Sequence, residues 1–108
     1  VTKILIDAYP NRLVNIHPSL LPSFKGLDAV GQAIKAKVKL TGCSVHLVNV
    51  NVDDGPILVQ AATSIKKNEN RNELLKRIQI LEHMILPTGI QIAASHWRKD
   101  INTMDSML

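Results

Sequence analysis

Two prolines placed just after a short apolar run most constrain the fold of this chain. Residues 13–16 are mainly apolar, and Pro18 and Pro22 follow them closely. Because proline lacks an N–H and disfavours helix in the residue before it, no helix crosses this segment, and the run indicates the end of a buried strand. Residues two apart on a strand point to one face, so Asn15 and His17 should project together. Ligands of open α/β sheets bind beyond such strand ends, which makes this pair a candidate site.

A carboxylate is predicted to join this pair from a turn later in the chain. Asp53 lies between two predicted strands, at 43–50 and 56–65, which are close enough in sequence to form an antiparallel hairpin. An amide that donates to an oxyanion, an imidazole and a carboxylate make a plausible acyl-transfer site without any side-chain nucleophile. We therefore expect Asn15, His17 and Asp53 to converge at the edge of the sheet.

The remaining periodic segments predict two helices. The first covers 29–37 after an Asp28 N-cap, and its buried stripe is Val30, Ala33 and Ile34. The second starts near Asn70, capped by Asn68 or Asn70, and its apolar stripe is Leu74, Ile78, Leu81 and Ile85. Pro87 should kink or restart this helix, because it removes the hydrogen bond to the carbonyl of His83. The fold class is therefore α/β, with helices against a small sheet.

Composition narrows the functional class. With 108 residues the chain forms at most one small domain, and its 3% aromatic content does not support base-stacking platforms for nucleic acid. The net charge of +4 is too diffuse to identify a ligand, and the basic run is expected to be a solvated face: Lys35, Lys37 and Lys39. A single cysteine, Cys43, excludes an internal disulfide and fits a reducing compartment. Without a signal peptide or a long apolar span, the chain is expected to be soluble and cytoplasmic, with no membrane partner.

These segments together resemble the carboxy-terminal half of the phosphoribosylglycinamide formyltransferases, folate-dependent enzymes of purine synthesis. The matching text is residues 15–26, 41–46 and 52–57, then Glu82-His83 and Pro87. The resemblance assigns residues 1–97 to the carboxy-terminal part of a Rossmann-like formyltransferase fold, a mixed sheet flanked by helices, and leaves 98–108 as a tail. It also implies a preceding amino-terminal half with a glycine-rich phosphate loop, a motif that these residues lack.

The resemblance implies transfer of a formyl group from the cosubstrate 10-formyltetrahydrofolate to the amine of glycinamide ribonucleotide. Asn15 and His17 would stabilise the tetrahedral oxyanion, and a nearby carboxylate favours the charged form of His17. Asp53 would pair with His17 and relay protons through a water, so no covalent intermediate is needed. Asp54 departs from the family pattern, which usually has a small or neutral residue there.

Two binding subsites are also implied by the resemblance. The segment from Leu47 to Asp53 would line the folate pocket through backbone groups, with contacts from Leu47, Val48, Asn49, Val52 and Asp53. On the ribonucleotide side, Glu82 would accept hydrogen bonds from the ribose hydroxyls, assisted by Gln79 and Pro18. His46 is expected to give structural support, and Cys43 to pack in the core.

Two alternatives stay open, a formyltetrahydrofolate deformylase and an inactive fragment of the fold. Pro18 and Glu82-His83 favour the transferase, since the deformylases lack the Glu-His pair and usually carry a second histidine where Pro18 stands. The spacing of His, Cys and acidic residues fits no zinc pattern, so no metal is expected. An apolar strand edge without its neighbours is a template for pairing, so we expect these residues to form a homo-oligomer, with absent or very weak catalysis.

Overall fold

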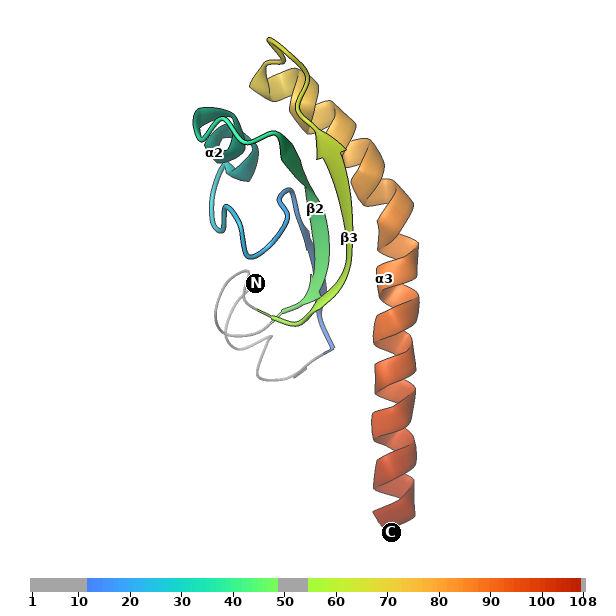
Figure 1. The fold of residues 1–108 in the computed structure, drawn as a ribbon. Helices are drawn as coiled ribbons and strands as arrows, with labels where there is room; N and C mark the ends of the chain where they lie inside the picture. Colours follow the sequence, from blue (N-terminus) through green and yellow to red (C-terminus); the bar gives the residue numbers. More distant parts are fainter. Residues whose placement is uncertain (1–11, 49–54, 108) are drawn as a thin grey trace.

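The computed structural model describes residues 12–48 and 55–107, although within α3 it does not describe the side chains of 100 and 102–107. Within these described residues, three strands and two helices follow one another (Figure 1). They are β1 (Val14–His17), α2 (Ala29–Lys35), β2 (Leu40–Leu47), β3 (Ile57–Ser64) and α3 (Arg71–Met107). Each lies where the sequence predicts an element, and the end points differ by a few residues, except that α3 continues to Met107, through residues expected to be a tail.

The three strands form one sheet in the order β1-β2-β3, and both pairings are antiparallel. The predicted hairpin between β2 and β3 is confirmed. A mixed sheet also needs parallel pairs, and the strands in the described part of the chain contain none. His17 lies opposite Ser44, and Ser44 lies opposite Gln60, so these three polar residues form one row across the sheet. Directly opposed residues share a face, so their side chains lie on the same side.

Helix α3 covers the other face of the sheet (Figure 1). Its residues Leu74 and Ile78 are fully buried and form the core with Val30 and Cys43. The predicted stripe is confirmed, since Leu81 and Ile85 pack against the same cluster. Gly89 allows the close approach further along, because a Cβ there would lie 2.5 Å from Cγ1 of Val45. A larger residue would therefore push the helix off β2.

Pro87 lies inside α3 and does not end it. Helix α3 is continuous from Arg71 to Met107, and Figure 1 shows its axis changing direction partway along. The restart allowed by the sequence does not occur, because Gly89 and Ala93 are buried after the proline and hold the next turns in place. Residues 98–107 continue the helix although they carry no usable apolar period. At about 1.5 Å per residue this helix accounts for the elongated shape, 59 Å in its longest dimension.

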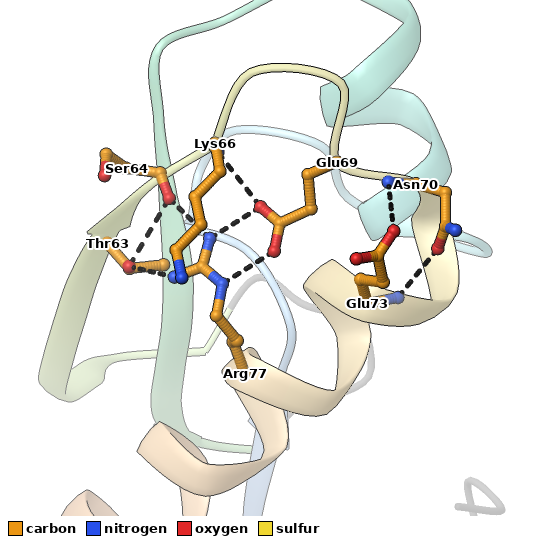
Figure 2. Close-up of polar contacts among 7 residues, drawn as sticks. All are labelled: Thr63, Ser64, Lys66, Glu69, Asn70, Glu73 and Arg77. Carbon is orange, nitrogen blue, oxygen red and sulfur yellow. Dashed lines mark hydrogen bonds and ion pairs between the residues drawn. The ribbon is translucent and has the colours of Figure 1, made fainter.

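A bidentate ion pair fixes the start of α3 against the end of β3 (Figure 2). Arg77 donates from Nε and Nη2 to the two carboxylate oxygens of Glu69, both at 2.7 Å. The same guanidinium donates to Oγ1 of Thr63 at 2.8 Å and to the carbonyl of Ser64 at 2.7 Å. These contacts lower the pKa of the Glu69 carboxyl to about 2, chiefly through the hydrogen bonds from Arg77. The pair therefore stays ionised well into the acidic range.

Side-chain caps set where both helices begin. Asn70 accepts from the Glu73 N–H at 2.9 Å while Glu73 accepts from the Asn70 N–H at 3.3 Å, a reciprocal capping box. The predicted Asp28 cap of α2 is confirmed, since its carboxylate accepts from Gly31 N at 3.2 Å. Arg71 Nε lies 2.7 Å from Oδ1 of Asp28 and so ties the two helix starts together. As expected for a solvated face, the basic run is exposed: Lys35, Lys37 and Lys39.

Candidate active site

Asn15 and His17 share one face of β1, as their spacing predicts. Asn15 lies opposite His46 and His17 lies opposite Ser44, so both pairs face the side of the sheet that α3 leaves open. Asn15 is exposed, whereas His17 is only 7% exposed. Oδ1 of Asn15 accepts from the N–H of Ile16 at 2.9 Å, so the NH₂ group is the part of this amide suited to donate to an oxyanion.

The imidazole of His17 is oriented by the segment that follows β1. Its Nε2 donates to the carbonyl of Phe24 at 2.9 Å. A carbonyl can only accept, so this bond places a proton on Nε2. Nδ1 is the ring nitrogen that this bond does not use.

A buried hydroxyl and an amide hold residues 18–24 on the sheet. Ser44 on β2 donates to the carbonyl of Ser19 at 2.7 Å and accepts from the N–H of Leu21 at 3.0 Å. Gln60 on β3 donates to the carbonyl of Leu21 and to Oγ of Ser44, both at 2.9 Å. Ser19 and Ser44 are both completely buried. Residues 18–24 thus cover the polar face of β2. The Ser44 hydroxyl donates one hydrogen bond and accepts two, so all of its hydrogen-bonding capacity is used.

Glu82 lies on the part of α3 that faces the sheet. Burial raises the pKa of its carboxyl, and the charges of His83 and His17 partly oppose that rise. Glu82, the predicted ribose ligand, is therefore close enough to His17, the predicted catalytic histidine, for the charge of His17 to affect its pKa. Gln79, one turn earlier, is exposed, and Pro18 is half-buried directly after β1. Glu82 and Gln79 belong to α3, whereas Pro18 directly follows β1.

The predicted folate segment is described only at its beginning. Leu47 donates its N–H to Pro56 at 2.9 Å, and Val48 donates its N–H to Leu13 at 2.8 Å. Because both N–H groups belong to the sheet, ligand contacts from these two residues fall to their carbonyls and side chains. Asn49, Val52 and Asp53 lie outside the described residues, so their predicted roles and the convergence of Asp53 on His17 stay predictions.

His46 and Cys43 are packing residues in the fold. His46 is 1% exposed, and its Nδ1 donates to the carbonyl of Leu47 at 3.1 Å. Burial, with a further contribution from the charge of Glu82, raises the pKa of the Cys43 thiol to about 11. A thiol that stays protonated near neutrality is a poor nucleophile. This supports the packing role predicted for Cys43.

Two other kinds of feature are absent from the part of the chain that the structure describes. There, no three His, Cys, Asp or Glu side chains gather as a metal site would require. None of the helices within 12–48 and 55–107 combines the length and the apolar character needed to cross a membrane.

Known proteins are similar to this chain in sequence and in fold. The sequence profile described as formyl transferase matches residues 1–90, most of the chain. The chain belongs to the formyl transferase family. A phosphoribosylglycinamide formyltransferase from Bacillus subtilis is 46% identical over 87 residues, which cover 81% of this chain and 45% of that protein. The chain therefore spans under half the length of this curated relative.

Solved formyl transferases have the same fold. Glycinamide ribonucleotide transformylase 1 from Symbiobacterium toebii superposes with a TM-score of 0.84 at 45% identity, covering 88% of this chain and 45% of that one. A formyltetrahydrofolate deformylase from Pseudomonas syringae superposes with a TM-score of 0.77 at 32% identity, covering 82% and 30%. The expected formyltransferase fold is thus confirmed, and the deformylase is the more distant of these two neighbours.

The sequence of this formyl transferase does not mark the groups that orient His17. Ser44 and Gln60 are common polar residues inside predicted strands, and nothing in their local sequence indicates a role beside His17. The signal was the register, because a hairpin that pairs Ser44 with Gln60 puts two polar side chains side by side. The carbonyl of Phe24 carried no signal, since every residue has one.

Proposed function

We propose that this chain supplies the catalytic residues of a folate-dependent transferase in de novo purine biosynthesis. The enzyme moves a formyl group from 10-formyltetrahydrofolate to the amine of glycinamide ribonucleotide, in the cytoplasm. Family membership supports the reaction class, and the names of the relatives support this acceptor. The observation that carries the proposal is the placement of Asn15 and His17 on one face at the end of β1, with Glu82 in reach of the His17 charge.

The proposed roles follow from the chemistry of each group. The amine attacks the formyl carbon, and the Asn15 amide and a protonated His17 donate to the oxygen that gains charge. Asp53 supports His17 and accepts the proton that the amine loses, through a water, while the leaving nitrogen of the folate gains one. Residues 47–53 line the folate side, and Glu82 with Gln79 and Pro18 lines the ribonucleotide side.

A chimera tests the proposal directly. In it, the 87 matched residues of the Bacillus subtilis relative are replaced by the aligned residues of this chain. We expect the chimera to formylate glycinamide ribonucleotide with 10-formyltetrahydrofolate. A folded chimera that transfers no formyl group would contradict the proposal. Release of formate that does not depend on the ribonucleotide would instead identify a deformylase, whose acceptor is water.

Glu82→Gln in this chimera should weaken ribonucleotide binding. A hydrogen bond to a charged group is worth about 1.5–3 kcal/mol, so we expect KM for the ribonucleotide to rise about tenfold or more while kcat changes little. Because the pKa of Glu82 is raised by burial, the wild-type KM should also rise as the pH falls through that raised value. Glu73→Gln neutralises an exposed carboxylate on the same helix and should leave KM unchanged. Equal effects of the two variants would rule out the ribose contact.

We also propose that the chain alone forms a homo-oligomer. β1 is an outer strand of the described sheet, and exposed apolar side chains occur along α3: Ile80, Met84, Ile90 and Ile101. Apolar surface of this kind favours association. Light scattering should therefore report a mass that increases with concentration. A monomer at every concentration would contradict this expectation.

A further inference from the structure

The row of polar residues across the sheet has a consequence for the chemistry of His17. His17, Ser44 and Gln60 lie opposite one another on β1, β2 and β3 and share one face. Ser44 and Gln60 do not bond the imidazole in any contact described above. They bond the segment that carries its acceptor, the carbonyl of Phe24.

The connection runs through hydrogen bonds as far as Ser23, the residue before Phe24. Gln60 holds Ser44 and the carbonyl of Leu21, and Ser44 holds both the Ser19 carbonyl and the Leu21 N–H. Ser19 in turn donates from its hydroxyl to the carbonyl of Ser23 at 2.5 Å, next to Phe24. Three backbone groups of the segment are therefore fixed from two strands, and a fourth is fixed within the segment itself.

We propose that Ser44 and Gln60 are positioning residues that set the tautomer of His17. By holding the segment on the sheet, they keep the Phe24 carbonyl 2.9 Å from Nε2, and this acceptor retains the proton on that nitrogen. In the protonated ring of the proposed mechanism both nitrogens carry a proton, and because Nε2–H stays bound to the Phe24 carbonyl, Nδ1–H is the donor that serves the reaction. The assignment of Nδ1 to formyl transfer rests on the proposed function, whereas the control of the tautomer does not.

The environment of Ser44 explains why so small a group has this effect. Its side chain is completely buried, and its oxygen donates once and accepts twice. Removing it leaves a buried N–H, a carbonyl and an amide without their partner, and such groups reorganise to recover hydrogen bonds. The segment can then shift, and the Phe24 carbonyl shifts with it.

Nitrogen-15 NMR of the imidazoles at alkaline pH, where the rings are neutral, measures the tautomer of His17 in this chain. The four histidines are assigned by single substitutions. We expect the Nε2–H form to dominate in the wild type, and Ser44→Ala to shift His17 to a mixture with a large Nδ1–H fraction. Ser44→Thr retains the hydroxyl and should restore the wild-type spectrum, which a loss of packing alone would not explain.

Two further variants complete the test. Gln60→Met removes the amide from a partly exposed position that tolerates change, and it should shift the tautomer in the same direction even where Ser44→Ala does not fold. Thr41→Val is the matched control, because Thr41 is 1% exposed on the same strand and its hydroxyl has no hydrogen-bond partner in the described structure. It should leave His17 unchanged.

The outcomes separate this inference from the proposed function. An unchanged Nε2–H population in Ser44→Ala and Gln60→Met, or an equal shift in Thr41→Val, would overturn the positioning role. In the chimera, Ser44→Ala should lower kcat by on the order of 10²-fold, the effect of a misplaced catalytic group, with KM little changed. A chimera without transferase activity would refute the proposed function. The role of Ser44 and Gln60 in setting the His17 tautomer would still be tested by the NMR measurement on this chain.

Discussion

Asp53→Asn should lower kcat of the chimera by about 10²–10⁴-fold, the usual contribution of a positioned acid or base. The substitution removes the charge that supports a protonated His17 and the group that accepts the proton from the amine. The amide is the same size as the carboxylate, so the fold should be retained. Steady-state kinetics with both substrates measures the effect, and circular dichroism checks the fold.

Asp54→Asn is the matched control for this prediction. The neighbouring carboxylate undergoes the same change of charge in the same turn, so any general electrostatic effect on His17 would appear in both variants. We expect its kcat to stay within a few-fold of the wild-type value. If Asp54→Asn were the more damaging substitution, the catalytic carboxylate would have been assigned to the wrong residue. If neither mattered, the proton relay itself would be wrong.

Local patterns predicted those parts of the fold that depend on neighbours in sequence. The stripe of α3, including Leu74 and Ile78, repeats every three or four residues and therefore marks the buried face of a helix. The two-residue spacing of Asn15 and His17 placed them on one face of β1 for a similar reason. The hairpin followed from two apolar runs separated by a short turn. In each case the geometry is a property of the backbone period.

Contacts between distant residues had no such signal. Ser44 and Ser19 are separated by 25 positions, and their hydrogen bond decides that residues 18–24 lie on the sheet. A serine on a strand predicts a polar face, which is normally solvated, and here that face is buried under backbone. The path of α3 through Pro87 is a second example. Buried contacts of Gly89 and Ala93 stabilise the helix beyond the proline, so tertiary packing overrides the local penalty.

The reactive side chains of the site can therefore be predicted from the sequence, whereas the groups that orient them are harder to predict. Side chains that react need particular groups, and an amide, an imidazole and a carboxylate stand out in a sequence. The groups that orient them are backbone carbonyls and common polar residues such as Gln60. Their role exists only through the register of the sheet. Reactive residues can be recognised by the chemical group of the side chain, whereas positioning residues can be recognised only once their position in the sheet is known.

Glu69→Gln should destabilise the chain by about 1.5–3 kcal/mol at neutral pH, because it breaks a bidentate ion pair that is largely shielded from water. The Glu69 side chain is 4% exposed and that of Arg77 is 25% exposed, so water replaces the lost contacts poorly. Arg77 also holds Thr63 and the carbonyl of Ser64, so its reorientation loosens the junction of β3 and α3 (Figure 2). Urea unfolding at neutral pH measures the loss.

The pH dependence of this loss gives the sharper test. The folded pKa of Glu69 is about 2, below its ordinary value of 4.5, so the wild type gains stability from the ionised carboxylate above 4.5. That gain disappears as the pH falls from about 4.5 towards 2, because in this window the unfolded chain takes up the proton while the folded protein does not. The stability gap between Glu69→Gln and the wild type should therefore close across this window. Glu73→Gln, in the first turn of α3, is the control: glutamine keeps the acceptor of the capping box, so this variant should lose much less stability than Glu69→Gln. A gap for Glu69→Gln that stays constant down to pH 2 would mean that the carboxylate stabilises the junction by its shape and not by its charge.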